Sequence, residues 1–191
     1  MGSVTSSKDL LMLLLYAKGH RDEICEPIVG RTRLVKMVFL FDREVRRTFN
    51  LDKIIPDSVI PQFEPYHYGP FSAQVYTDAE FLVDMGFVVV RDSEEGDLLA
   101  EEVDEYDYWQ AGAGEVTDDE PTNEEVFSLT DLGREFVAVG EAGELSNDQW
   151  AALHRFKAVC TATPLRTFLR YVYTKYPDYT TESKIRDQVL R

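Results

Sequence analysis

Residues 86–90 read GFVVV and residues 126–133 read VFSLTDLG. Each stretch holds a short run of β-branched and aromatic residues that is typical of a strand, at residues 87–90 and 126–129. Thr130 can cap a helix that runs from Asp131 to Val139. In a winged-helix unit, a β-hairpin wing comes after the third helix. The order of elements there is a helix, a strand, a connection, a second strand and a short exit helix. The two stretches therefore predict a winged-helix core.

Three helical segments precede the first of these strands. The first is expected to begin at Ser6 or Ser7 and to end at Gly19. The second covers about residues 32–48 and has the clearest helical periodicity, with apolar residues at 34, 37, 38, 41 and 45. The third is expected from about Ser72 to Met85. Between the second and third, residues 50–70 hold four prolines, which predict a connector with at most a short extended piece.

A C-terminal helical unit is predicted after Gly140 and Gly143. Ser146 and Gln149 fit a capping box, a further helix opens at Pro164, and a last short helix covers about residues 181–190. The predicted fold is mainly α with a small β-hairpin. It comprises a winged-helix-like domain over residues 1–140, with a wing insertion at residues 92–125, and the C-terminal helical unit over residues 141–191.

The wing insertion carries the acidity of the whole chain, whose formal net charge is −15. Residues 92–125 contain fifteen acidic residues and no Lys or Arg, so twenty acids and twenty bases remain elsewhere. A connection of this length is functional or disordered. Three interpretations stay open: a disordered solvating loop, an intramolecular lid over a basic surface, or a nucleic-acid mimic, because Tyr106, Tyr108 and Trp109 lie among the carboxylates.

Cations gather on one face of the second helix and in the C-terminal unit. On an α-helix, the four cations of the second helix lie within about 80° of one another. Such a face is either solvated or contacts phosphates. From residue 150 onward, eight bases face three acids. The candidate phosphate-contacting residues are Arg33, Lys36, Arg43, Arg47, Arg166 and Arg170.

The third helix is a poor reader of base edges in this sequence. Winged-helix proteins that read DNA present Arg, Lys, Asn or Gln from this helix to the major groove. Here residues 72–85 contain no base and include three acids. Ser72 and Gln74, at its N-terminal end, are the only candidates for base contacts.

Catalysis and metal binding find little support in the sequence. There is no Gly-rich phosphate loop, nucleophile elbow or H-E-x-x-H motif. Pro177-Asp178 and Glu182-Ser183-Lys184 resemble the two halves of a nuclease motif, but those halves belong on separate strands. The three His and two Cys lack metal-ligand spacing. We therefore expect no enzyme activity, cofactor or metal.

The N-terminus and the cysteines favour a cytoplasmic protein without a membrane anchor. Residues 1–7 have no basic stretch of a signal peptide, and the apolar run at residues 10–15 is too short to span a bilayer. Cys25 and Cys160 are most simply two reduced thiols. The oligomeric state is left open.

Three motifs carry a resemblance to a known family: GRTRLVKM at residues 30–37 followed by FLF at 39–41, YHYGPFS at 66–72, and YPDYTT at 176–181. Together they resemble the YwgA-type prokaryotic proteins. The first ninety residues are also distantly similar to the Panacea-domain (SocA-like) antitoxins. That similarity implies a role in toxin–antitoxin or phage-defence systems through protein contacts, and neither resemblance implies catalytic residues.

Two functions are compatible with these features. The leading hypothesis is a non-catalytic winged-helix protein of regulatory or defence type that binds double-stranded nucleic acid through its basic helical faces. The alternative is a protein-interaction module, an antitoxin-like protein or complex subunit, that does not bind DNA.

Overall fold

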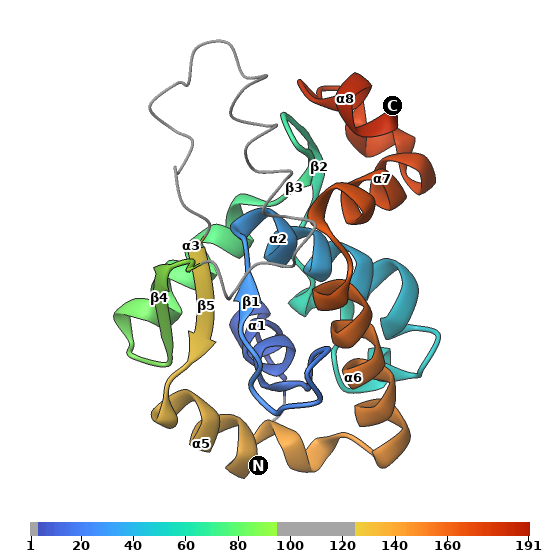
Figure 1. The fold of residues 1–191 in the computed structure, drawn as a ribbon. Coiled ribbons are helices and arrows are strands. Elements are labelled where there is room, and N and C mark those ends of the chain that lie inside the picture. Colours follow the sequence, from blue (N-terminus) through green and yellow to red (C-terminus); the bar gives the residue numbers. More distant parts are fainter. Residues whose placement is uncertain (1–3, 95–124) are drawn as a thin grey trace.

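The computed structural model describes residues 4–94 and 125–191 (Figure 1). In this part of the chain helices dominate and the strands form small antiparallel sheets, which confirms the expected mainly α class with a small β element. Most of the acidic insertion, residues 95–124, lies outside the described part of the chain, and so do its three interpretations.

Helix α1 (Ser7–Tyr16) is buried along most of its length. Of the two expected caps, Ser6 and Ser7, it is Ser6 that caps the helix, and it forms a capping box with Asp9. All six residues from Leu10 to Leu15 are buried, because α1 is covered by α3, α5 and β5. The helix ends before the expected Gly19, since the Tyr16 carbonyl accepts a hydrogen bond from the returning Cys25 amide at 2.9 Å.

Helix α2 (Arg31–Leu40) continues into a π-helical turn over Phe41–Arg46. Together they cover nearly the whole segment predicted from periodicity. Hydrogen bonds in a π-helix run from i to i+5, so one more residue fits into that turn. Side chains after Phe41 are therefore rotated relative to those of a continuous α-helix.

The larger sheet has three antiparallel strands: β1 (Ile28–Val29), β4 (Val88–Asp92) and β5 (Glu125–Leu129), in the order β1-β5-β4. Val90 lies opposite Phe127 in the β4–β5 pair, which confirms the expected pairing of these two strands. The sequence does not predict strand β1. It has only two residues, and Pro27 and Gly30 beside it are typical of a loop.

The proline-rich connector contains a second, two-stranded sheet. Strands β2 (Glu64–Tyr66) and β3 (Gly69–Phe71) form a hairpin, which leads directly into α3 (Ala73–Asp84). Gly69 has a φ of +85°, and a Cβ there would lie 2.9 Å from the Tyr173 ring. Glycine therefore allows both the turn and its close packing on α7.

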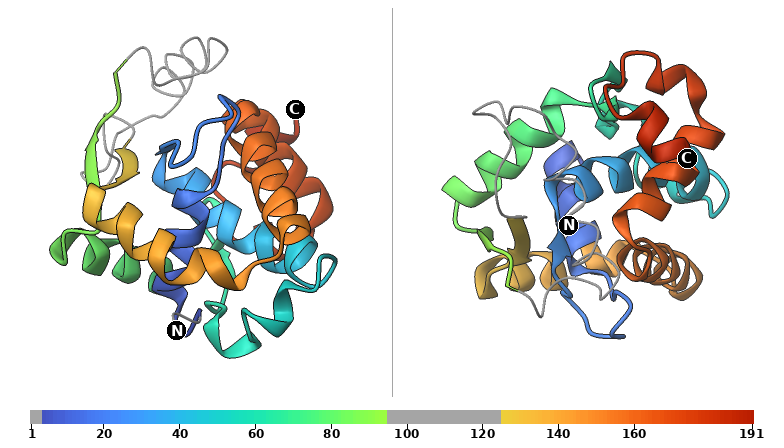
Figure 2. Two further views of the ribbon diagram at one scale, coloured as in Figure 1. Left: turned by 90° about the horizontal axis from the view of Figure 1, so that it is seen from below. Right: turned by 45° about the horizontal axis from the view of Figure 1, so that its top comes forward.

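Four further helices complete the chain as described: α5 (Asp131–Val139), α6 (Asn147–Ala162), α7 (Leu165–Lys175) and α8 (Arg186–Leu190). The predicted caps at Thr130 and Ser146 are confirmed. In Figure 2, α6 and α7 lie along one side of α2. Their apolar faces join α1, α2 and the sheet in one hydrophobic core, which includes Phe39, Leu153 and Val172.

Candidate nucleic-acid interface

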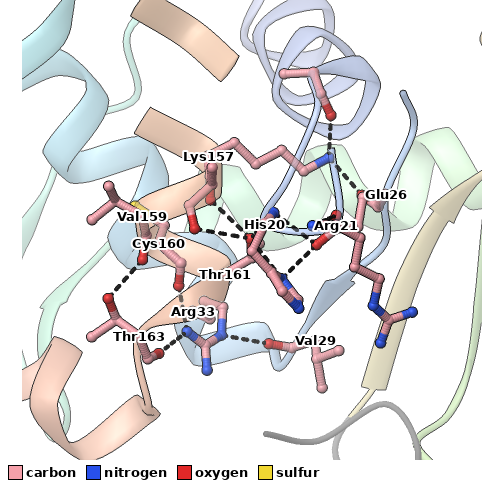
Figure 3. A network of polar contacts seen from close by, with 12 residues as sticks. His20, Arg21, Glu26, Val29, Arg33, Lys157, Val159, Cys160, Thr161 and Thr163 are labelled. Atoms are coloured by element: carbon pink, nitrogen blue, oxygen red, sulfur yellow. Dashed lines mark hydrogen bonds and ion pairs between the residues drawn. The ribbon is translucent and has the colours of Figure 1, made fainter. Parts of the chain in front are cut away.

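Arg33, a predicted phosphate contact, lies inside the protein with 2% of its surface exposed. Its guanidinium donates hydrogen bonds to the carbonyl oxygens of Val29 at 3.1 Å, Cys160 at 2.5 Å and Thr163 at 2.7 Å (Figure 3). The last two acceptors end helix α6, where carbonyl groups lack partners within the helix. Arg33 thus fastens the C-terminal helices to α2 and is not available to a phosphate.

Lys36, the next predicted contact, is also 2% exposed. Among the described residues, none accepts a hydrogen bond from its amine or forms an ion pair with it. Burial lowers the pKa of Lys36 to about 7. The prediction of one solvent-exposed cationic face on α2 is therefore wrong at Arg33 and Lys36, because α6 and α7 cover that side of the helix.

A pH-dependent gain in stability is expected for Lys36→Met. The folded-state pKa of about 7 lies below the ordinary value of 10.5, so protonation favours the unfolded chain. This cost is fully present below pH 7 and disappears as the pH rises through 10.5. Urea unfolding should show that Lys36→Met raises the free energy of unfolding by roughly 1–2 kcal/mol at pH 6. A gain that is the same at pH 6 and pH 10.5 would contradict this origin.

Lys157 of α6 is the second buried lysine, and its surroundings differ. Its ammonium donates to the carbonyl oxygens of Leu15 and Ala17 at 2.8 Å and of Glu26 at 2.5 Å. Three acceptors match the three protons of a charged lysine. Although burial lowers the pKa of Lys157 to about 7, the three acceptors fit its charged form.

The Glu26 carboxylate organises the loop beside Lys157 (Figure 3). It accepts hydrogen bonds from the backbone amides of His20 at 3.2 Å and Arg21 at 2.7 Å, and lies 2.7 Å from the His20 ring nitrogen Nδ1. Gly19 permits this approach, since a Cβ there would meet the carboxylate at 2.4 Å. The network is internal and holds the N-terminal loop against α6. We therefore assign it a structural role.

Arg43 and Arg47 are the two α2-side candidates that remain accessible. The Arg43 guanidinium donates to the Tyr179 hydroxyl at 2.8 Å and lies 5.4 Å from the Phe39 ring centroid. The Arg47 side chain is 71% exposed and lies 3.5 Å from Asp57. Between them, Arg46 is buried and donates to the Ile55 carbonyl at 2.9 Å. The rotation at the π-helical turn places Arg46 inside and leaves Arg47 outside.

The cations of the C-terminal unit differ in their exposure and in their partners. Arg166 is partly buried, whereas Arg170 is exposed and donates through Nε to the Val189 carbonyl at 3.0 Å. Three further exposed cations pair with no other side chain in the described part of the chain: Lys184, Arg186 and Arg191. Of the eight bases from residue 150 onward, only Lys157 is buried. Apart from Lys157 and the partly buried Arg166, these cations lie at the surface.

The N-terminal end of α3 does not provide the expected base contacts. Ser72 is 3% exposed, so its predicted role as a base reader is wrong. Gln74 is exposed, but its side-chain amide donates to Asp78 at 2.7 Å. Asp78 in turn is fully buried and pairs with Lys8 at 3.0 Å. Asp78 therefore joins α3 to α1, and Gln74 supports it from the first turn.

Comparisons with protein-family models, with curated proteins and with solved structures found no match. Across residues 4–94 and 125–191, no three His, Cys, Asp or Glu side chains come together as ligands for a metal ion. No helix in the same residues is long and apolar enough to cross a membrane.

Proposed function

We propose that this chain is a non-catalytic winged-helix protein of regulatory or defence type, acting in the cytoplasm, that binds nucleic acid through the phosphate backbone. The order of α1, β1, α2, α3, β4 and β5 supports the winged-helix assignment, as does the strand order β1-β5-β4. In such a unit a three-stranded antiparallel sheet ends in a hairpin after the third helix. The connection between α2 and α3 departs from the short turn of a helix-turn-helix motif, since it contains the β2–β3 hairpin.

The observation that carries the proposal is the set of exposed cations in the C-terminal unit. Lys184, Arg186 and Arg191 have no described side-chain partner, and Arg170 donates through Nε to a backbone carbonyl. Clustered Lys and Arg at the surface are the electrostatic footprint of phosphate binding. The acidic α3 and its occupied Gln74 argue for contacts with the backbone over recognition of base sequence.

A charge-reversal experiment tests this proposal. Arg170, Lys184 and Arg186 would be changed together to Glu, and binding to a fluorescein-labelled oligonucleotide would be followed by anisotropy at low salt. We expect the affinity to fall by about tenfold or more. A matched triple variant at Lys18, Lys53 and Arg134 makes the same change in net charge elsewhere. Absence of binding by the unaltered chain, or equal losses in both variants, would contradict the proposal.

The alternative function, a protein-interaction module, is favoured by a different surface. Leu132, Phe136 and Val139 are exposed at the spacing i, i+4 and i+7, and so form an apolar stripe on α5. Thr130, the cap of α5, donates to the Gly86 carbonyl at 2.7 Å, which fixes this helix beside the end of α3. Asp131 and Glu135 are exposed on α5 itself, and Glu80 and Asp84 are exposed on α3. An amphipathic helix with a basic rim is the partner that this surface would complement.

A synthetic amphipathic helix with a Leu face and a Lys rim would test this second candidate. We expect it to bind the unaltered chain and to lose affinity about tenfold or more when Leu132 and Phe136 are changed to Ser. Changing the exposed Val159 of α6 to Ser serves as the control. Equal binding by all three proteins would rule out α5 as the docking surface.

A further inference from the structure

The β2–β3 hairpin and the start of α3 carry a continuous series of aromatic rings, which we call the aromatic ladder: His67, Tyr66, Phe71 and Tyr76. The ring centroids of His67 and Tyr66 are 4.3 Å apart with an interplanar angle of 17°, so the two rings are stacked. Tyr66 lies 4.8 Å from Phe71, and Phe71 lies 5.2 Å from Tyr76. Each ring thus restricts the orientation of the next.

The two ends of the aromatic ladder differ in accessibility. At the inner end, the Arg31 guanidinium lies 4.9 Å from the Tyr76 ring centroid and pairs with Glu125 at 2.5 Å. That end is therefore closed by a neutralised cation. The other end is His67, which is partly exposed and stacks on Tyr66, itself 43% exposed. A further planar ring can stack only near this exposed end.

The aromatic ladder lies beside the cations of the C-terminal unit. The Lys184 backbone amide donates to the His67 carbonyl at 2.9 Å, so the side chains of Lys184 and His67 start from neighbouring points of the surface. The hairpin also packs on the 3₁₀ turn Pro177–Thr180, and Tyr173 of α7 lies beneath Gly69. In Figure 1 the hairpin stands next to α7 and α8. Exposed rings and unpaired cations therefore share one side of the molecule.

We infer that the aromatic ladder is a stacking platform for unpaired bases, and that the preferred ligand of this surface is single-stranded nucleic acid. This inference rests on the proposed binding of phosphates by the C-terminal unit. Sites for single strands combine aromatic side chains, on which bases stack, with cations that follow the backbone. In a duplex the bases are already stacked on one another, so they cannot lie on His67 while the same phosphates contact Lys184 or Arg186.

The test compares three fluorescein-labelled ligands of about fifteen nucleotides: oligothymidine, an abasic strand with the same phosphates, and a duplex. Anisotropy titrations would use the full chain and its Tyr66→Ala, Tyr66→Phe and Phe49→Ala variants. Base stacking on one aromatic side chain is worth about 5-fold to 100-fold in affinity. Tyr66→Ala removes the ring on which His67 stacks, so we expect this variant to lose that factor for oligothymidine and to leave binding of the abasic strand unchanged. Tyr66→Phe, which keeps the ring, and Phe49→Ala, which removes an exposed ring outside the ladder, should bind as the unaltered chain does.

The outcomes separate this inference from the proposed function. If oligothymidine and the abasic strand bind equally well, or if Tyr66→Ala binds both as the unaltered chain does, the stacking platform is wrong while phosphate binding stands. If Tyr66→Ala weakens oligothymidine binding and the Arg170, Lys184 and Arg186 reversal does not, the platform stands and the phosphate contacts are wrong. If no strand binds at low salt, both fall. Circular dichroism of Tyr66→Ala would verify that the variant is folded.

Discussion

Replacing Lys157 with Met is expected to lower the free energy of unfolding by about 3–5 kcal/mol. The side chain is fully buried, and its three protons meet the carbonyl oxygens of Leu15, Ala17 and Glu26. Met has a similar length but no donor, so all three carbonyls would lose this hydrogen bond in a site that water does not reach. Each unmet buried carbonyl costs about 1–3 kcal/mol, and removal of the buried charge offsets part of the sum.

Urea unfolding at pH 7 measures this effect, and Arg155→Met is its matched control. Arg155 lies two residues earlier on α6, is exposed and has no described partner. Its replacement should change the free energy of unfolding by less than about 0.5 kcal/mol. Similar values for the two variants would show that the Lys157 contacts do not hold the N-terminal loop against α6.

Replacing Arg33 with Met is expected to destabilise the protein by about 2–4 kcal/mol, the second largest effect. The guanidinium bonds to Cys160 and Thr163 satisfy carbonyl groups at the end of α6, and its bond to Val29 reaches strand β1. One side chain thus connects α2, the sheet and the C-terminal helices. Arg47→Met, on the exposed side of the same helical segment, should leave the urea midpoint almost unchanged.

The burial of Arg33 and Lys36 restricts which variants can test nucleic-acid binding. A change of Arg33 or Lys36 to Glu would place a carboxylate in the core, where a charge without a partner is costly. Loss of nucleic-acid binding by such a variant would report unfolding rather than a lost contact. The Arg170, Lys184 and Arg186 variant avoids this difficulty because these side chains are exposed.

Local signals in the sequence identify most helices and their ends. Ser6, Thr130 and Ser146 cap helices as expected, because a cap depends on residues within one turn. The strands of the β4–β5 pair are equally clear from their β-branched residues. Strand β1 is not, since its two residues are ordered by pairing with β5, almost one hundred residues later in the chain.

The burial of the α2 cations could not be predicted from periodicity. The pattern correctly places Arg33 and Lys36 on a face distinct from the apolar stripe, but it does not tell what covers that face. The covering atoms come from Cys160 and Thr163, over 120 residues away, and a buried Arg surrounded by carbonyls has no local signature. The sequence does not reveal the aromatic ladder for a related reason: its rings lie in a proline-rich connector, and the hairpin that aligns them packs on Tyr173 and on the turn Pro177–Thr180, about one hundred residues later in the chain.

The salt dependence of binding tests the proposed phosphate contacts most directly. The logarithm of the association constant for oligothymidine would be measured against the logarithm of the salt concentration, for the unaltered chain and for the Arg170, Lys184 and Arg186 charge-reversal variant. We predict a linear fall for the unaltered chain, and a slope that is shallower in the variant by about one for each cation that meets a phosphate. A slope near zero, or the same slope for both proteins, would contradict binding of nucleic acid through the C-terminal unit.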